Sequence, residues 1–371
     1  MIIKILVQNN VQGIFLLIFK KKTREVRMKK RYFLIILLTF FLSACSGNEA
    51  NEVVVYNAGE YMDMDLVEQF EEDTGIEVIY ETFTSDEEMF VKLTQSANNY
   101  DVVIPMDYMV EKLLKYDMLE PIDFNNVPNV KYIMDDYKNL SFDPEGKFTV
   151  PYFSSSFGIV YNTDMVDEPI DSWADLWDPK YKGEIIMYDL PRLSMSVALQ
   201  KLGYSINTTN MDEINEATEE LVKQKPLVYA YLTDEARDVI VQGDAIMSVM
   251  YSGDALLMST ENENLKYVMP KEGGNLQIDS FAIPKGAKNK KNAEIFINYF
   301  TDPEISAANA EWMEGFTSPV EGVREMLPDY IANSDEAYPD PEALPPIEVF
   351  KDLEEYMEVY NNAWVRVLAS Y

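Results

Sequence analysis

The chain has 371 residues with one cysteine and no histidine, and its 64 acidic side chains outnumber 31 basic ones, for a formal net charge of -33. Without histidine, Ser-His-Asp catalysis is excluded, and with a single thiol so are Cys/His zinc sites. The acidic balance disfavours nucleic acid, whose binding needs Lys and Arg to neutralise phosphates. We expect no metal site, no cofactor and no nucleic-acid partner.

A secretion signal is predicted near the N-terminus. A basic cluster at residues 28–31 precedes an apolar run at 32–42, which ends in Ser43, Ala44 and Cys45. A charged start, an apolar core and small residues before a cleavage point are typical of signal peptides. The pattern resembles the lipobox of bacterial lipoproteins, which implies a signal peptide at 28–44, lipid on Cys45 and a lipidated tether at 45–52. We therefore expect a protein anchored outside the bacterial plasma membrane.

Residues 1–27 precede that signal. Their apolar patch at 11–19 is shorter than the roughly 20 residues of a transmembrane helix. Because Met28 opens a complete signal, we hypothesise that translation begins there and that 1–27 is a misassigned extension. Without residues 1–44 the chain keeps 22 basic and 63 acidic residues, a net charge of -41. Such a surface attracts cations, although acidity can also serve solubility alone.

Strand and helix patterns alternate after the tether. Strands are expected at 53–56, 76–80 and 101–104, with helices at 65–73 and 86–96 between them. This alternation predicts βαβ units and a parallel sheet. In such sheets ligands bind beyond the carboxyl ends of the strands, which are here residues 57–61, 82–86 and 105–108.

A second α/β region is predicted from about residue 151. Its strands are expected at 185–187, 226–231, 245–250, 265–268 and 278–283, and its helices at 193–202, 211–222 and 234–241. Helices then dominate, at 291–300, 303–313 and 348–368. Trp173 and Trp177, four apart in a helical segment, are expected in the core. The 327 residues after the signal exceed one ordinary hydrophobic core, which predicts two lobes.

Several dispersed segments resemble the spermidine/putrescine-binding proteins that serve ABC importers. They follow one another in a fixed order, and the most specific are 72–80 (EDTGIEVIY), 100–105 (YDVVIP), 172–183 (SWADLWDPKYKG), 201–209 (KLGYSINTT), 251–255 (YSGDA), 269–274 (MPKEGG) and 279–284 (DSFAIP). The resemblance implies an α/β, two-lobed periplasmic-binding-protein fold of type II (a venus flytrap) with mixed, mostly parallel sheets. The chain would cross between the lobes, with 53–151 and 281–325 in lobe 1 and 152–280 and 326–371 in lobe 2.

The resemblance also implies a ligand site with a checkable chemistry. Aliphatic amines with a pKa near that of lysine, about 10.4, are cationic at neutral pH. A closed site must replace the water around each charge, and carboxylates do so because burying unpaired charge is prohibitive. Aromatic faces cover the methylene chain and attract the cations by roughly 0.5–2 kcal/mol each. The site should therefore combine acids with aromatic side chains.

Eight residues are expected in this site. The resemblance assigns Glu60, Tyr61, Tyr108, Tyr251, Asp254, Asp279 and Phe316 to it, and Asp107 is an additional acid at the cleft mouth. Asp279 corresponds to the family's central acid, and Asp254 to an acid of putrescine-preferring members. Structural alternatives exist for each residue. Asp279 could brace a crossover strand, Asp254 could cap a helix, Glu60 and Asp107 could be solvated loop acids, and the aromatic side chains could belong to the core.

Other positions depart from the family pattern. Tryptophans are replaced by Ala58 and Gln277, two acids of spermidine-preferring members by Leu190 and Leu193, a serine by Met106 and a glutamine by Phe350. These losses weaken a spermidine assignment, while Asp254 and Asp279 still allow a diamine.

The expected function is that of a monomeric, non-enzymatic receptor that captures putrescine or spermidine and hands it to a membrane permease. A first alternative keeps the fold but binds thiamine or a quaternary amine. Ferric iron is disfavoured because histidine and an adjacent tyrosine pair are both missing. A more distant alternative is a surface hydrolase that uses an Asp/Glu pair.

Overall fold

The computed structural model describes residues 51–340 and 342–370. The expected extension at 1–27, the signal peptide at 28–44, Cys45 and most of the tether lie outside the described residues. From Glu52 onward the chain forms one unit. No described helix combines the length and the apolar character needed to span a bilayer.

Three parallel strands and their helices open the fold. Strand β1 (Glu52–Ala58) pairs with β2 (Glu77–Phe83) and β3 (Val102–Val103), and the connecting helices are α2 (Met64–Thr74) and α3 (Asp86–Ser96). The Asp63 carboxylate caps the start of α2, and Gly75 ends it with a left-handed φ of 70°, a conformation that glycine adopts without strain. Helix α4 (Asp107–Lys115) and strand β4 (Leu119–Glu120) follow.

The second half contains another group of strands and helices. The strands are β6 (Ile185–Tyr188), β7 (Val228–Leu232), β8 (Met247–Tyr251) and β9 (Leu265–Val268). The helices between them are α5 (Pro191–Lys201), α6 (Met211–Gln224), α7 (Ala236–Val241) and α8 (Ser252–Glu261). The C-terminal part adds α9 (Lys290–Phe300), α10 (Pro303–Met313), α11 (Asp329–Ala332), β11 (Ile347–Glu348) and α12 (Tyr356–Ala369).

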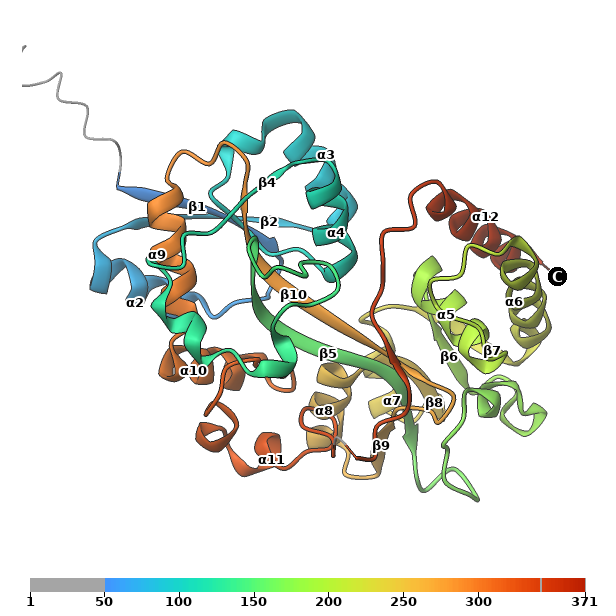
Figure 1. The fold of residues 1–371 in the computed structure, drawn as a ribbon. Coiled ribbons are helices and arrows are strands. Elements are labelled where there is room, and N and C mark those ends of the chain that lie inside the picture. The colour runs from blue at the N-terminus through green and yellow to red at the C-terminus, as the bar shows by residue number, and fades with distance from the viewer. Residues whose placement is uncertain (1–50, 341, 371) are drawn as a thin grey trace, which may run out of the picture. The chain divides into compact units, whose positions relative to one another are not determined.

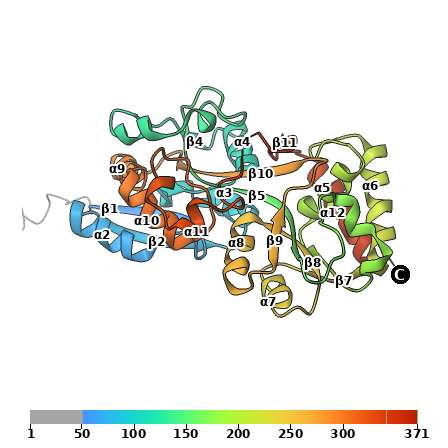
Figure 2. The same cartoon turned by 90° about the horizontal axis from the view of Figure 1, so that it is seen from below.

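Two long strands join these groups. Strands β5 (Thr149–Asn162) and β10 (Gly274–Pro284) pair antiparallel in the middle of the sheet order β2-β1-β3-β10-β5-β8-β6-β7. All 14 residues of β5 are buried. Figure 1 shows both strands running from the β1–β3 group to the β6–β8 group, and Figure 2 shows the same connection from below.

The sheet is mixed, as expected, but it is not mostly parallel. Of the ten strand pairings among the described residues, five are parallel and five antiparallel. The antiparallel pairings all involve β5 or β10. Strand β5 runs antiparallel to each described strand that it pairs with, and β10 to all but β11. The βαβ pattern of the flanking segments does not reveal this.

The hydrophobic core is divided between the same two groups of strands and helices. Two clusters gather apolar side chains mainly from residues 53–153 and 278–337, and two others from residues 157–265 and 353–367. Leu327, Ile331 and Ala337 pack in the first group, so the expected placement of all of 326–371 in lobe 2 is corrected for this segment. The chain therefore changes groups a third time, after residue 337.

Most predicted elements are present. Strands β4, β5 and β11 and helices α4 and α11 were not predicted, nor was the length of α8, and the last helix begins at Tyr356, eight residues later than expected. Strand β5 has the sequence TVPYFSSSFGIVYN. Its proline and three serines are typical of a turn or loop, so the sequence does not indicate a fully buried strand. Trp173 is fully buried, as expected for a core residue, and Trp177 packs against the same cluster.

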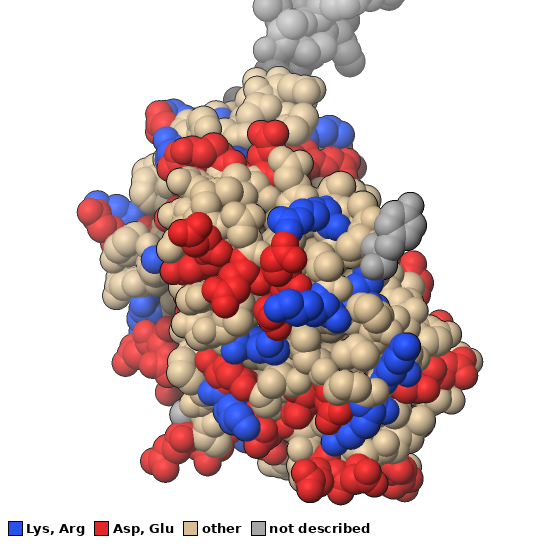
Figure 3. Space-filling view, turned by 90° about the vertical axis from the view of Figure 1, so that its right-hand side faces the viewer, with Lys and Arg blue, Asp and Glu red and all other residues tan. Residues whose placement is uncertain are grey.

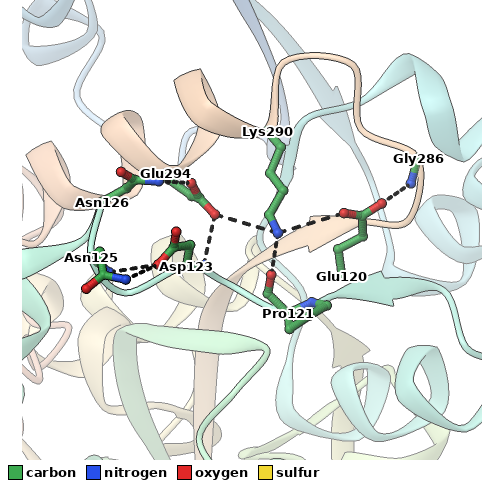
Figure 4. A network of polar contacts seen from close by, with 8 residues as sticks. All are labelled: Glu120, Pro121, Asp123, Asn125, Asn126, Gly286, Lys290 and Glu294. Carbon is green, nitrogen blue, oxygen red and sulfur yellow. Dashed lines mark hydrogen bonds and ion pairs between the residues drawn. The ribbon is translucent and has the colours of Figure 1, made fainter.

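A polar network fixes the segment after β4 to helix α9 (Figure 4). The Glu294 carboxylate is only 2% exposed and accepts hydrogen bonds from the Asp123 N–H at 2.9 Å and the Asn126 amide at 2.6 Å. Lys290 lies 3.8 Å from Glu294 and donates to the Pro121 carbonyl at 2.7 Å.

Charged residues elsewhere lie mostly on the surface, and in Figure 3 acidic and basic side chains are interspersed on the face shown.

Candidate functional site

The carboxyl ends of β1 and β3 meet strand β10. Tyr61 follows β1, and Met106 forms an isolated antiparallel bridge with Asp279 of β10. The Ser280 N–H also donates to the Pro105 carbonyl at 3.1 Å. These contacts place the carboxyl ends of the N-terminal strands against a strand more than 170 residues later in the chain.

Asp279 is the centre of this junction. It is 3% exposed and accepts a hydrogen bond from the Tyr61 phenol at 2.5 Å. The Gln277 amide donates to both of its carboxylate oxygens at 3.1 Å. Burial raises the pKa of Asp279 to about 6, while the hydrogen bonds from Tyr61 and Gln277 oppose the rise.

Two further carboxylates are buried close to Asp279. Asp107 is 1% exposed and accepts from the backbone N–H groups of Tyr108 at 2.6 Å and Ile278 at 3.2 Å. Asp86 is 3% exposed and accepts from the Met106 N–H at 3.1 Å. Burial, reinforced by the charge of Asp279, raises the pKa of both groups well above the ordinary value.

Asp86 was not among the residues expected from the sequence. A signal for it was available, because residues 82–86 are the carboxyl end of the second strand, where ligands bind in such sheets. Its position at the first residue of α3, behind the N-cap Ser85, made it look like an ordinary helix-start acid. Only the fold shows that it is buried beside Asp107 and Asp279.

Aromatic rings line the same region. The Tyr61 ring packs edge-on against Phe316 with centroids 5.3 Å apart, and Phe316 also contacts Phe153. The Tyr251 ring packs against Tyr188 at 5.8 Å and Phe157 at 5.2 Å. The charges of Asp279, Asp107 and Asp254 all contribute to raising the pKa of Tyr251, after burial and Tyr188.

Asp254 lies in the first turn of α8, but it is not the N-cap, which is Tyr251. Its side chain is 23% exposed and lies 3.6 Å from the Arg237 guanidinium. Burial raises the pKa of Asp254 to about 6, although the charge of Arg237 opposes the rise. Phe316 packs so closely on Gly253 that a Cβ there would come within 2.8 Å of the ring.

Tyr108 and Glu60 complete the expected set. The Tyr108 phenol donates to Glu87 at 3.2 Å, and burial is the main cause that raises its pKa well above the ordinary value. Glu60 is exposed, adopts a left-handed φ of 53°, and makes none of the hydrogen bonds to Asp86, Asp107 or Asp279 described above. The structure therefore brings together the acids at 107 and 279 and leaves Glu60 outside their network.

The positions that depart from the family pattern form a different environment. Leu190 is 45% exposed, whereas Leu193 is buried in the core. The Arg192 guanidinium lies 4.5 Å from the centroid of the Phe350 ring and donates to the side-chain oxygen of Asn207 at 3.0 Å. Leu193, Phe350 and the Arg192 guanidinium therefore occupy the part of the structure where the family pattern has acids and a glutamine.

Chemically, the arrangement suits an organic cation. None of the ion pairs between described residues involves Asp86, Asp107 or Asp279. Arg192 contributes to lowering the pKa of Asp107 without forming an ion pair with it. No group of three or more metal-ligating side chains within 51–340 and 342–370 is arranged to hold a metal ion.

Comparison with known proteins agrees with this architecture. The family model for bacterial extracellular solute-binding proteins matches residues 65–342. The spermidine/putrescine-binding periplasmic protein of Escherichia coli (strain K12) is 36% identical over 334 residues, which cover 90% of this chain and 96% of that protein.

Solved structures give the same result. The spermidine/putrescine ABC transporter substrate-binding protein PotD of Streptococcus pneumoniae superposes with a TM-score of 0.76 at 37% identity, covering 85% of this chain and 98% of its own. The TpPotD lipoprotein of Treponema pallidum superposes with a TM-score of 0.74 at 26% identity, covering 85% and 99%. The expected two-lobed solute-binding fold is thereby confirmed.

Proposed function

We propose that this chain, which belongs to the bacterial extracellular solute-binding proteins, is the component of an ABC importer that captures a polyamine and delivers it to the permease. Members of this family bind solutes and are not enzymes. The ligand class is inferred from the relatives named above together with the geometry of the site.

One observation carries the proposal. Three carboxylates, Asp86, Asp107 and Asp279, are each at most 3% exposed, and none of them forms an ion pair with another described residue. Burying such charges is costly unless a cation compensates them. A primary ammonium group supplies one positive charge and three N–H donors, which match carboxylate oxygens at hydrogen-bond distance.

The shape of the rest of the site favours a chain-like amine. Aromatic rings at Tyr61, Tyr251 and Phe316 offer faces for methylene groups and for the ammonium charge. Asp254 supplies a second acidic position for the other end of a diamine. We therefore assign ligand contact to Tyr61, Asp107, Tyr108, Tyr251, Asp254, Asp279 and Phe316, add Asp86, and place Glu60 at the rim.

Calorimetric titration of the chain from residue 46 onward with putrescine, spermidine, spermine and thiamine tests this proposal. We expect binding of putrescine or spermidine and weaker or no binding of thiamine, whose quaternary nitrogen has no N–H donor for the buried acids. Failure to bind any of the three polyamines would overturn the proposal. Native mass spectrometry of the protein as purified identifies a retained amine by its mass.

The location of the receptor is the second part of the proposal. The signal pattern at 28–44 and the similarity to a lipoprotein of Treponema pallidum support a lipid anchor on Cys45. An anchored receptor stays beside its permease while its ligand diffuses. In a host that processes lipoproteins, Cys45→Ser should release the protein from the membrane fraction and leave amine affinity unchanged. Peptides from residues 1–27 in that material would contradict a start at Met28.

A further inference from the structure

The ion pair between Asp254 and Arg237 lies at the second acidic position of the site. Asp254 is in the first turn of α8, and Arg237 is in α7, the preceding helix. The closest charged atoms are 3.6 Å apart, and the side chains are 23% and 36% exposed. No other ion pair or side-chain hydrogen bond of Arg237 is found among the described residues, so its guanidinium is held only by this carboxylate.

The Tyr251 ring, three residues before Asp254 in the chain, is affected by Asp254 and by the buried acids. Tyr251 immediately precedes α8, and its pKa responds to Asp279, Asp107 and Asp254. The Tyr188 ring contacts Tyr251 at 5.8 Å, and its pKa responds to Asp234 and Asp254. The causes that act on Asp254 itself are burial, Arg237 and Asp234, without Asp279. Asp254 is therefore an acidic position separate from Asp279, and the Tyr251 ring, which precedes α8 and packs against Tyr188, is affected by both.

We propose that Arg237 is an internal competitor for the second ammonium group of the ligand, and that it limits the affinity of the site for diamines. This inference rests on the proposed function. The first ammonium enters the cluster of Asp86, Asp107 and Asp279, with which no Lys or Arg of the described residues forms an ion pair. The second must replace the Arg237 guanidinium at Asp254, because one partly buried carboxylate in contact with two cations would place like charges side by side.

Arg237 also favours the ionised form of Asp254, which would strengthen cation binding, and the experiment must separate this effect from competition. Its charge contributes to lowering the pKa of Asp254, so its removal favours the protonated form of that acid. At pH 8.5 wild-type Asp254 is ionised, since its pKa is about 6 with Arg237 present, and a variant affinity that is the same at pH 8.5 and 9.0 shows that Asp254 is ionised without Arg237 too. Aliphatic diamines stay cationic at this pH because their pKa values are near 10.4. Competition alone then determines the result.

The test is calorimetric titration with putrescine at pH 8.5 and low salt. Arg237→Gln should tighten putrescine binding by about twofold to fivefold, the range expected for a partly exposed ion pair. In an Asp254→Asn background the same substitution should change nothing, because the contested carboxylate is gone. Arg237→Met serves as a second variant. Arg366→Gln is the matched control, since Arg366 pairs with Glu219 on the surface and should leave affinity unchanged.

The outcomes separate this inference from the proposed function. If wild type binds putrescine and Arg237→Gln binds it equally or more weakly, Arg237 is no competitor, and the polyamine receptor stands. A gain that persists in the Asp254→Asn background also overturns the inference, because it shows a nonspecific effect of surface charge. If wild type binds no amine, both proposals fail.

Discussion

The Tyr61 phenol donates a 2.5 Å hydrogen bond to Oδ2 of Asp279, which lies 218 positions later in the chain. The bond joins the carboxyl end of β1 to the long strand β10. It also stabilises the ionised form of a carboxylate that burial would otherwise neutralise. The Tyr61–Asp279 hydrogen bond therefore affects both where the Asp279 carboxylate lies and whether it is charged.

Asp279→Asn should abolish most of the affinity for putrescine. The substitution keeps the size of the side chain but removes the charge that we propose pairs with the ammonium group of the ligand. Truncating one partner of a buried charge pair costs about 2–5 kcal/mol, or roughly 30-fold to several thousand-fold in Kd. Titration calorimetry at pH 7.5 measures the loss. Glu68→Gln, on the exposed face of α2, is the control, and a Kd within twofold of wild type for Asp279→Asn would contradict the prediction.

Tyr61→Phe should shift the pH dependence of binding. Asp279 binds a cation only when ionised, so wild-type affinity should fall as pH drops through about 6. Without the Tyr61 hydrogen bond the pKa of Asp279 rises further, and the midpoint should move to higher pH. Kd values measured from pH 5 to 8.5 show the shift. Tyr116→Phe, at an exposed tyrosine, should reproduce the wild-type curve, and identical curves for all three proteins would exclude this role of Tyr61.

Asp279→Asn should also stabilise the unliganded protein at neutral pH. The pKa of Asp279 is about 6 in the folded state against an ordinary value of 3.8, so the folded state binds more protons between these values. Stability therefore falls as pH rises from about 4 to about 6, and the loss persists above pH 6. The amide avoids this loss, which reaches at most about 3 kcal/mol.

Thermal unfolding without ligand measures this effect. The melting temperature of Asp279→Asn should exceed that of wild type at pH 7.5, and the difference should vanish near pH 4. Asp164→Asn, at an exposed acid, should melt like wild type at both values. A variant less stable than wild type at pH 7.5 would show that the hydrogen bonds to Asp279 outweigh its desolvation.

Helix α4 should restrain the C-terminal segment. Glu111 accepts a hydrogen bond from the Asp352 N–H at 2.8 Å, and Lys115, one turn later, forms an ion pair with Glu354. Glu111→Ala removes the acceptor, at a cost of about 1 kcal/mol. Hydrogen exchange at the Asp352 amide should become about fivefold faster, while Glu68→Ala should leave it unchanged. An unaltered exchange rate would mean that this contact does not hold the segment.

Local patterns in the sequence were sufficient for many elements. The predicted helices 86–96 and 303–313 and the predicted strand 265–268 have the bounds of α3, α10 and β9. Caps and apolar spacing act within a few residues, so they can be read directly. Strand β5 shows no apolar/polar alternation, because both of its faces are covered, and its proline and serines are typical of turns. Its existence depends on neighbours that are distant in the chain.

The sequence by itself determined the family, the lack of histidine chemistry and the presence of acids and aromatic residues at the strand ends. The tertiary structure decided which of them meet. Asp86 is buried close to Asp107 and Asp279, Glu60 is exposed outside their hydrogen bonds, and Asp254 forms an ion pair with Arg237. The physical reason is that the protonation state of an acid depends on its burial and its hydrogen bonds. Both are set here by strand β10, which pairs antiparallel with β5. Those contacts join residues about 170 to 220 positions apart, beyond the reach of any local pattern.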